Sequence, residues 1–319
     1  MTLDEILKEI KNAQTVVILA HEGPDGDAIG SSLAMCLMIK SLDENKRVDV
    51  LMKDYPANFS YLPGIEYIKK ETDLDRYDLA IVLDSPDLNR VNEEYRRNFE
   101  DADVKVEFDR HSKNSMFADY NIVNHVSPAC SQVLVSSFEY LGLEMTKDII
   151  INLMTGIITD TGGFKNSNTT SESFEFAAWA LTKGINISKI YNTSMMIMSK
   201  NKFEVQKLAS SRLEFLADGK VTFTYITKED SDALGLKEGD HDGIVEIGRC
   251  IEGVEVSIFL YEKEKGFKAS LRSNDYVNVA EVCSVFSGGG HIKAAGATMT
   301  KDLEESKTMI VNEVLKHIK

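Results

Sequence analysis

The sequence has few cysteines and no long hydrophobic run. Cys36, Cys130, Cys250 and Cys283 are far apart in the chain, and none of them belongs to a Cys-x-x-Cys pair. This pattern is typical of buried thiols in a reducing cytoplasm and excludes a disulfide framework or a cysteine zinc site. Because apolar stretches stay short of a membrane span and the acidic N-terminus differs from a signal peptide, we expect a soluble cytoplasmic protein with no membrane partner.

Basic residues are also scarce. The chain contains 36 Lys and Arg against 51 Asp and Glu, which gives a formal net charge of −15 at pH 7. A protein that holds long nucleic acid non-specifically needs a basic surface, so this composition excludes long duplex nucleic acid as a partner. If the protein handles phosphates, it does so through metal ions and a few placed cations, which suits small or short substrates.

The length of 319 residues predicts two domains, because it exceeds the comfortable size of one hydrophobic core. Strand and helix signals alternate through the first two-thirds of the chain, which favours a parallel sheet with helices on both faces. The predicted strands are 15–20, 47–52, 78–84 and 104–109, and the predicted helices are 28–41, 129–141, 148–159 and 171–182.

The pattern changes after residue 219. The segments 221–226, 253–261 and 267–272 alternate apolar and polar residues like antiparallel strands with one solvated face. Helices are predicted near 279–285 and 303–318. We therefore expect an α/β protein with a parallel-sheet, Rossmann-like N-terminal domain and a smaller α+β C-terminal domain. The predicted boundaries are 1–190 for the first domain, 191–216 for a helical linker and 217–319 for the second domain.

The loop after the first predicted strand crowds chemically active side chains together. Residues 21–31 read His-Glu-Gly-Pro-Asp-Gly-Asp-Ala-Ile-Gly-Ser. Ligands bind at the carboxyl ends of the strands in open α/β sheets. His21, Asp25 and Asp27 lie at positions i, i+4 and i+6, and side chains of these types can converge on a divalent cation. The loop therefore predicts a metal-dependent hydrolase.

Other interpretations of this loop explain less of it. Asp25, Asp27 and Gly30 imitate the start of a calcium-binding loop, but the twelfth position is Cys36 where a bidentate Glu is needed. The loop is neither a dinucleotide-binding turn nor a Walker loop. Asp27 alone could be a helix N-cap, but a cap does not explain His21 and Asp25 beside it.

Further acidic and imidazole groups follow other predicted elements. Asp84 and the sequence Asp109-Arg110-His111 come at the ends of strands, and Asp160 ends a helical pattern before a glycine-rich turn. A single Asp after a strand is usually a turn residue, but several of them together with histidines predict a shared site. Such a set suits Mn²⁺, with Mg²⁺, Co²⁺ or Zn²⁺ as alternatives. Carboxylates that bridge two ions would support two-metal hydrolysis of a phosphoester.

The second predicted domain carries a glycine-rich segment. Residues 286–296 read Phe-Ser-Gly-Gly-Gly-His-Ile-Lys-Ala-Ala-Gly. Consecutive glycines let backbone N–H groups approach an anion, and His291 and Lys293 add charged donors. Arg272 at a strand end could clamp a phosphate. The structural alternatives are a flexible turn before a helix and, for Arg272, a surface salt bridge.

In chain order, these motifs resemble those of the DHH-family phosphoesterases, in the branch with a C-terminal glycine-rich nucleotide-binding domain. The loop at 21–31 resembles the first motif of the family, Asp84 the second and Asp160 the fourth. Residues 109–111 stand where the namesake Asp-His-His belongs. The segment 288–296 resembles the signature of the second domain, so the likeness covers nearly the whole chain.

Within the family, the likeness is to the cytoplasmic nanoRNase and pAp-phosphatase type, including its cyclic-di-AMP-pathway relatives. It implies cleavage of very short nucleotides to nucleoside 5′-monophosphates with two Mn²⁺ ions, a cleft between the domains and a possible homodimer. The first implied metal-ligand set is His21, Asp25, Asp84 and Asp160. The second is Asp27, Asp84, Asp160 and a histidine of the third motif. The implied substrate-binding residues are Arg272, Gly288, Gly289, Gly290 and His291, and the implied catalytic residues are Asp84, Asp160 and His111.

The third motif departs from the family pattern, because the expected first histidine is Arg110. A guanidinium has no lone pair to offer a cation, so Arg110 cannot be a metal ligand. Three alternatives stay open: His111 takes its place, water fills the vacancy, or the second metal ion binds weakly. We also predict that Arg110 binds a phosphate of the substrate.

Other functions are consistent with parts of the pattern. The leading prediction is hydrolysis of nanoRNA, dinucleotides such as pApA, or pAp. The alternatives are a cyclic-di-AMP phosphodiesterase, an inorganic pyrophosphatase built on the same first domain, and a nucleotide sensor whose metal centre decayed at Arg110.

Overall fold

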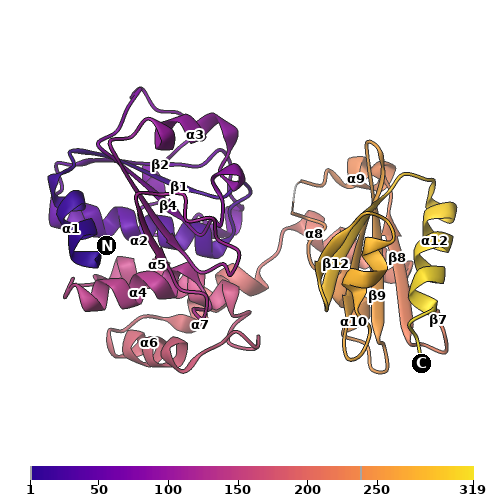
Figure 1. Cartoon of the computed structure of the whole chain (residues 1–319). Coiled ribbons are helices and arrows are strands. Elements are labelled where there is room, and N and C mark those ends of the chain that lie inside the picture. Colours follow the sequence, from indigo (N-terminus) through magenta and orange to yellow (C-terminus); the bar gives the residue numbers. More distant parts are fainter. Residues whose placement is uncertain (1, 238) are drawn as a thin grey trace. The chain divides into compact units, whose positions relative to one another are not determined.

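The chain folds into two compact units, one ending at Ile197 and one beginning at Met198. The structure is a computed structural model that describes residues 2–237 and 239–319. Figure 1 shows that each unit is built around one β-sheet. The boundaries at residues 190 and 217 stay a prediction. Within the predicted linker, α8 (Lys200–Ser211) packs on strand β8 (Val221–Ile226) of the second unit.

The N-terminal sheet is parallel and has six strands, in the order β3-β2-β1-β4-β5-β6. This confirms the predicted parallel α/β architecture. The bounds of its strands are β1 (Thr15–Ala20), β2 (Arg47–Leu51), β3 (Ile68–Lys69), β4 (Leu79–Leu83), β5 (Val104–Asp109) and β6 (Tyr120–Val123).

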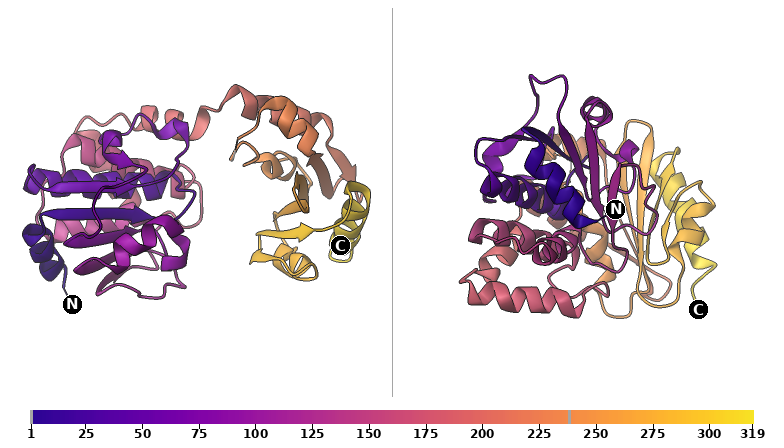
Figure 2. Two further views of the ribbon diagram at one scale, coloured as in Figure 1. Left: turned by 90° about the horizontal axis from the view of Figure 1, so that it is seen from above. Right: turned by 60° about the vertical axis from the view of Figure 1, so that its left-hand side comes forward.

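Helices cover both faces of this sheet, as Figure 2 shows from two further sides. Successive side chains of a strand point to opposite faces. In β1, Val16 and Ile18 therefore pack into the core that holds α2, α4 and α5, whereas Val17 and Leu19 pack against α3. The helix bounds are α1 (Leu3–Asn12), α2 (Gly26–Leu42), α3 (Glu93–Glu100), α4 (Cys130–Tyr140), α5 (Lys147–Asp160), α6 (Ser171–Thr182) and α7 (Ile187–Tyr191).

Helices α2 and α5 touch backbone to backbone because glycine stands where they cross. A Cβ at Gly30 would lie 2.5 Å from the carbonyl oxygen of Asn152. Real Cβ atoms do not approach oxygen that closely, so any larger residue would push the helices apart. Because Asp27 lies on the first turn of α2 and Asp160 ends α5, this close packing positions two of the predicted ligands.

The C-terminal unit has a mixed six-stranded sheet in the order β11-β12-β10-β9-β8-β7. The prediction of antiparallel strands is wrong for one pair: β8 runs parallel to β9. The reason is that α9 and α10 connect these two strands and return the chain to the same end of the sheet. The remaining strand bounds are β7 (Glu214–Leu216), β9 (Val256–Lys263), β10 (Gly266–Ser273), β11 (Gly289–His291) and β12 (Ala294–Met299).

Both faces of this second sheet also carry helices. One face packs against α11 and α12 through Val282 and Ile310, and the other packs against α8 and α10 through Val205 and Ile244. The bounds of these helices are α9 (Lys228–Leu234), α10 (Ile244–Arg249), α11 (Val279–Ser284) and α12 (Leu303–Leu315). The mixed sheet with helices confirms the predicted α+β C-terminal domain.

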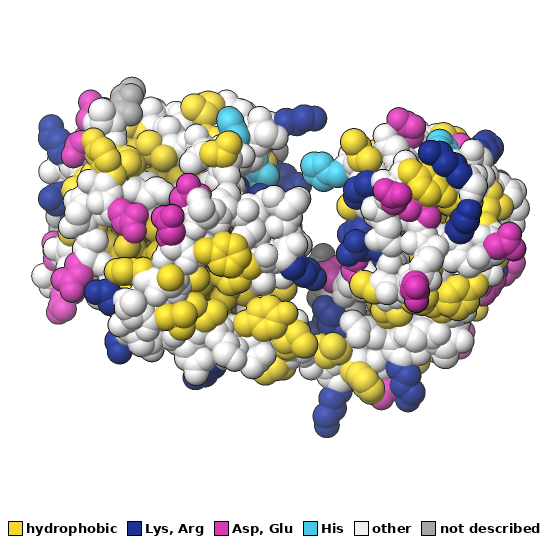
Figure 3. Space-filling view, turned by 90° about the horizontal axis from the view of Figure 1, so that it is seen from below, with side chains coloured by type: hydrophobic (Ala, Val, Ile, Leu, Met, Phe, Trp, Pro, Cys, Tyr) yellow, Lys and Arg dark blue, Asp and Glu magenta, His cyan; other side chains and the backbone are white. Residues whose placement is uncertain are grey.

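The surface of the N-terminal unit is partly hydrophobic. Figure 3 shows hydrophobic side chains gathered on the side of this unit that faces downward in Figure 1, where α6 lies. Phe174 and Leu181 of α6 are 55% and 59% exposed. Among the described helices, none combines the length and hydrophobicity needed to cross a membrane.

Three of the four cysteines are buried as expected, but Cys250 is exposed, because it follows the last turn of the short helix α10.

Candidate active site

Three neighbouring strands bring the predicted site residues to one edge of the N-terminal sheet. Strands β1, β4 and β5 lie side by side and run parallel, so their carboxyl ends meet. His21 follows β1, Asp84 follows β4 and Asp109 ends β5. This is the edge where α/β sheets bind ligands.

Asp25 caps the helix that starts in the first loop. One of its carboxylate oxygens accepts hydrogen bonds from the backbone N–H groups of Asp27 at 3.0 Å and Ala28 at 3.1 Å. The N-cap of α2 is therefore Asp25. On sequence grounds Asp27 is a possible N-cap, but the helix begins at Gly26, two residues earlier than predicted. The side chain of Asp25 remains 53% exposed and so accessible to a cation.

Asp27 is fully buried and holds the start of another helix. Its two carboxylate oxygens accept hydrogen bonds from the backbone N–H groups of Cys130 at 2.6 Å and Ser131 at 2.9 Å. These N–H groups belong to the first turn of α4, where the helix dipole favours a negative charge. Gly156 of α5 makes room for this carboxylate, since a Cβ there would lie 2.4 Å from Asp27 Oδ1.

The imidazole of His21 faces two carboxylates. Its Nδ1 lies 3.0 Å from the carbonyl oxygen of Glu22, which can only accept, so this nitrogen carries the proton. The opposite nitrogen, Nε2, lies 3.7 Å from Asp84 Oδ2 and 4.0 Å from Asp25 Oδ1. Ligand atoms of these three residues lie within 4.8 Å of one another. A neutral imidazole fixed by its other nitrogen is typical of a metal ligand.

Asp84 stands at the centre of the site in a strained backbone conformation. Its φ is +53°, a left-handed conformation that side chains other than glycine seldom adopt. The side chain is only 2% exposed. Burial, together with Asp27 and Asp25 nearby, raises the pKa of Asp84 well above its usual value. Such a carboxyl stays ionised only where a cation offsets its charge.

Arg110 lies among three of these carboxylates. Its Nη2 is 2.7 Å from Asp160 Oδ2, and its Nε is 3.7 Å from Asp84 Oδ1 and 3.9 Å from Asp27 Oδ2. Although burial opposes the charge of the guanidinium, the surrounding carboxylates raise the pKa of Arg110. The residue that sequence reasoning assigned to the substrate therefore contacts the acidic cluster directly.

The cluster fits a divalent cation. Among the described residues, Asp84 Oδ1 is buried and receives no hydrogen bond, whereas Asp160 Oδ2 is paired with Arg110 Nη2. Burial and the neighbouring Asp27 raise the pKa of Asp160 to about 10, even though Arg110 opposes the shift. A buried carboxylate oxygen without a hydrogen-bond donor, next to an imidazole, is a ligand set that Mn²⁺ and similar ions accept.

A hydrogen-bonded chain leads from the buried sheet to His111. The Nδ1 of His111 lies 2.7 Å from Asp109 Oδ1, and Asn114 Nδ2 donates to Asp109 Oδ2 at 2.6 Å. The same amide nitrogen donates to Glu107. Although burial opposes ionisation, the contacts with His111 and Asn114 lower the pKa of Asp109. These bonds orient the ring of His111.

Sequence reasoning missed Glu107 and Asn114. Glu107 is a charged residue inside a buried parallel strand, two positions before Asp109, so both side chains point to the same face. That alternation was a usable signal. Asn114 lies in the loop after β5 and carried no comparable pattern.

The glycine-rich segment of the C-terminal unit forms one strand of a hairpin, not a turn before a helix. Strand β11 pairs with β12 in antiparallel register, with Gly290 opposite Ala295. A Cβ at Gly288 would lie 2.3 Å from the carbonyl oxygen of Gly296, so this glycine is required for packing. A Cβ at Gly289, in contrast, would meet nothing within 4 Å in the described part of the chain. Gly289 is therefore the glycine whose backbone is open to a ligand.

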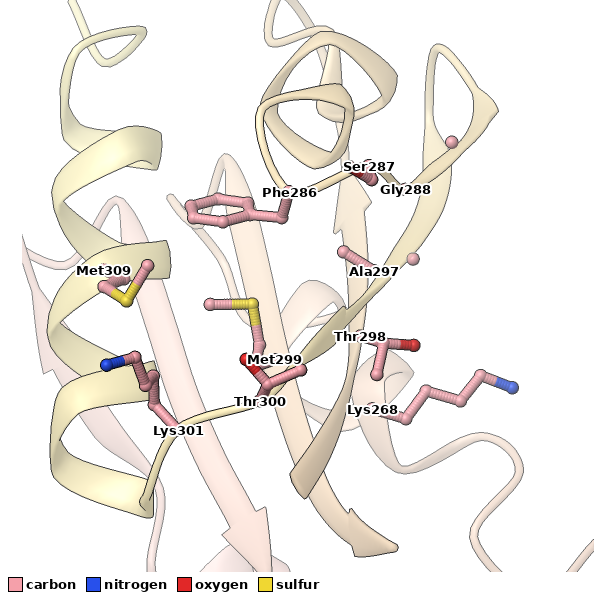
Figure 4. A pocket seen from close by; sticks show the side chains of 12 residues that line it. Lys268, Phe286, Ser287, Gly288, Ala297, Thr298, Met299, Thr300, Lys301 and Met309 are labelled. Atoms are coloured by element: carbon pink, nitrogen blue, oxygen red, sulfur yellow. The ribbon is translucent and has the colours of Figure 1, made fainter. Parts of the chain in front are cut away.

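A cavity of about 740 Å³ adjoins this segment. Gly288 and Gly289 line it, together with Phe286, Lys268 and Lys301 (Figure 4). Of the two lysines, Lys301 pairs with Glu305 at 3.0 Å, which leaves Lys268 without an acidic partner among the described residues.

The other predicted substrate residues are accessible. Arg272 donates from Nε to Glu246 Oε1 at 3.0 Å and is 32% exposed. It therefore forms the surface salt bridge that the sequence analysis gave as the alternative to phosphate binding. His291 is exposed at the end of β11. The N-terminal unit thus gathers His21, Asp25, Asp27, Asp84, Asp160, Arg110 and His111. The C-terminal unit carries Arg272, Gly288, Gly289, Gly290 and His291.

Comparisons with family models match both units. Residues 15–175 match the DHH family, N-terminal domain, and residues 218–319 match the DHHA1 domain. Together the two matches include every site residue named above.

Individual relatives align over nearly the whole chain. The bifunctional oligoribonuclease and PAP phosphatase NrnA of Thermus thermophilus is 30% identical, with 97% of this chain and 91% of the relative aligned. The protein of the same name from Bacillus subtilis is 21% identical, with 92% of each chain aligned.

Solved structures share the fold. The structure of an exopolyphosphatase-related protein from Bacteroides fragilis has a TM-score of 0.88 and 26% identity, covering 98% of this chain and 95% of its own. RecJ of Thermus thermophilus in complex with Mn²⁺ has a TM-score of 0.55 and 12% identity, covering 99% of this chain and 54% of its own.

Proposed function

This chain belongs to the DHH family and is a phosphoester hydrolase, and on that premise we propose that it cleaves very short oligonucleotides and pAp to nucleoside 5′-monophosphates. The observation that carries the proposal is the cluster formed by the buried carboxylates of Asp27 and Asp84 and the nearly buried carboxylate of Asp160. His21 lies beside Asp84, and aligned relatives of the chain are named bifunctional oligoribonuclease and PAP phosphatase. The net charge of −15 supports short substrates over long ones.

We propose Mn²⁺ as the cofactor. His21, Asp25 and Asp84 would hold one ion, because their ligand atoms already converge. When bound, the ion would activate water and offset charge on a phosphoryl oxygen. Asp84 contributes an oxygen on each side of the site, since Oδ2 faces His21 and Oδ1 faces Arg110. The number of bound ions therefore depends on whether Arg110 leaves room for a second ion beside Asp84 Oδ1.

The protein residues supply orientation and proton transfer. Asp109 holds Nδ1 of His111, which leaves the other ring nitrogen for exchange of a proton with the leaving oxygen. Arg110 places a fixed positive charge beside Asp84 and Asp160, where negative charge on a phosphate would also be stabilised.

The C-terminal unit is proposed to bind the substrate. The open backbone at Gly289, the exposed His291 and the guanidinium of Arg272 would hold a phosphate or the terminal nucleotide. Holding the nucleotide by its end converts weak binding into productive alignment. A cytoplasmic location is proposed with these substrates, and the homodimer implied by the family resemblance stays a prediction.

The test is nucleotide release from pApA, a short RNA, pAp, cyclic di-AMP and pyrophosphate, each with and without Mn²⁺. We expect Mn²⁺-dependent release of 5′-monophosphates from pApA, short RNA or pAp. Asp84→Asn should abolish it, whereas Asp101→Asn, which changes a half-exposed carboxylate at the end of α3, should not. Cleavage of pyrophosphate alone, or nucleotide binding without turnover at saturating Mn²⁺, would overturn the proposal.

A further inference from the structure

The acidic site has two halves that share Asp84. On one side, Asp84 Oδ2 lies 3.7 Å from His21 Nε2, and Asp25 lies 4.0 Å from the same nitrogen. On the other side, Asp84 Oδ1 lies 3.7 Å from the Nε of Arg110, with Asp27 and Asp160 around the same guanidinium. One half therefore consists of an imidazole and two carboxylates, whereas the other already contains the permanent guanidinium cation of Arg110.

The guanidinium is held inside the second half. Arg110 is 25% exposed and approaches oxygens of all three carboxylates within 3.9 Å. It has hydrogen-bond donors only, so it cannot coordinate an ion. Its permanent charge also repels any second cation brought between Asp27, Asp84 and Asp160. Arg110 therefore occupies the space between Asp27, Asp84 and Asp160 and compensates part of their negative charge.

The remaining route to a second ion runs through His111. Ligand atoms of Asp84, Asp109 and His111 lie within 4.8 Å of one another. However, Asp109 Oδ1 is already in contact with His111 Nδ1, and Asp109 Oδ2 accepts from Asn114 Nδ2 and from the backbone N–H of His111. An ion at this place would have to break the bonds that orient the ring. The structure thus favours an uncoordinated His111.

From these contacts, we propose that Arg110 replaces the second metal ion with a permanent guanidinium charge, so that the chain binds one divalent cation, at His21, Asp25 and Asp84. The inference rests on the proposed metal-dependent hydrolysis at the same site and revises the two ions implied by the family resemblance to one. The guanidinium of Arg110 then supplies the positive charge that a second metal ion would supply. Unlike an ion, it cannot dissociate into solution.

The decisive measurement is the number of Mn²⁺ ions bound per chain. Equilibrium dialysis with metal analysis is carried out on the intact natural protein, on Arg110→His and on Arg97→His. Arg97 is 87% exposed on α3 and serves as the matched control. We expect one ion for the natural protein, two for Arg110→His and one for Arg97→His. The electron paramagnetic resonance spectrum should show isolated Mn²⁺ in the natural protein and a coupled pair in Arg110→His.

Arg110→Gln separates the loss of charge from the gain of a ligand. It removes the repulsion without supplying an imidazole, so a second ion should bind measurably but more weakly than in Arg110→His. Circular dichroism of every variant establishes that it is folded. The ion count of the natural protein needs no variant, so the inference stays testable even if Arg110→His does not fold.

The outcomes separate this inference from the proposed function. Two ions in the natural protein, or one ion in folded Arg110→His, would overturn the replacement by Arg110 while leaving hydrolysis intact. One ion without hydrolysis of any nucleotide would support the inference and refute the function. If the natural protein binds no Mn²⁺, both are wrong.

Discussion

The Nδ1 atom of His111 lies 2.7 Å from Oδ1 of Asp109, and the backbone N–H of His111 donates to Oδ2 of the same carboxylate. Two contacts from one residue to one carboxylate fix both the backbone and the ring. Asn114 secures the carboxylate in turn. This arrangement makes Asp109 a positioning residue for His111 and leads to the first prediction.

Asp109→Asn should lower kcat by about 10- to 100-fold and leave KM nearly unchanged, because it disturbs the orientation of His111 without touching the substrate. Steady-state kinetics on pApA would measure both constants. Asp103→Asn, which alters a half-exposed carboxylate just before β5, is the control and should behave like the natural protein. A change confined to KM would show that Asp109 acts on binding instead.

Asp84→Asn should stabilise the metal-free protein while removing activity. Burial and neighbouring carboxylates raise the pKa of Asp84, so at neutral pH without a metal ion the fold must either take up a proton there or hold an uncompensated charge, and both cost free energy. Its neutral replacement should raise the unfolding free energy by about 0.5–2 kcal/mol in EDTA. Added Mn²⁺ should then stabilise the natural protein by ~2.7 kcal/mol at 100 times Kd, and the variant much less. Thermal melts with EDTA and with Mn²⁺ check this; equal metal stabilisation of both proteins would contradict it.

Glu107 should make stability depend on pH. Burial raises its pKa from 4.5 to about 7, so the folded state binds the proton more tightly than the unfolded chain. The stabilisation that protonated Glu107 gives the folded state is complete below pH 4.5. It is lost as the pH rises to about 7 and beyond, and the free energy of unfolding then falls by up to ~3 kcal/mol. Glu107→Gln should remove this loss and be more stable than the natural protein at pH 8. Urea unfolding between pH 4 and 8 would measure it, with Glu94→Gln at an exposed site as control.

Alanine substitutions at Gly288 and Gly289 should have different effects, the first on stability and the second on substrate binding. Gly288→Ala forces a Cβ to within 2.3 Å of the Gly296 carbonyl oxygen and should destabilise the protein by about 1–3 kcal/mol. Gly289→Ala meets nothing in the described chain, so its melting temperature should barely change. If substrate approaches this backbone, Gly289→Ala should raise KM for pApA about tenfold, equivalent to ~1.4 kcal/mol. An unchanged KM would exclude close approach at this position.

Much of the fold follows from local sequence patterns. The apolar runs that became β1, β4 and β5 were predicted within one residue of their observed bounds, because buried parallel strands are continuous hydrophobic segments. Their parallel arrangement placed Asp84 and Asp109 at one edge of the sheet. In the C-terminal unit, the parallel pairing of β8 with β9 was missed, because alternating polarity reports a solvated face and not strand direction.

By itself the sequence determined the two-unit α/β organisation, the members of the acidic cluster and the absence of a lone pair at Arg110, since each depends on residue type or on short-range periodicity. Only the tertiary structure decided what these residues contact. It joined Asp27 to the first turn of α4, more than 100 residues away, and placed Arg110 beside Asp160. Such contacts arise from helix packing on the sheet, where glycines such as Gly156 set the distance of approach, and no local spacing encodes them.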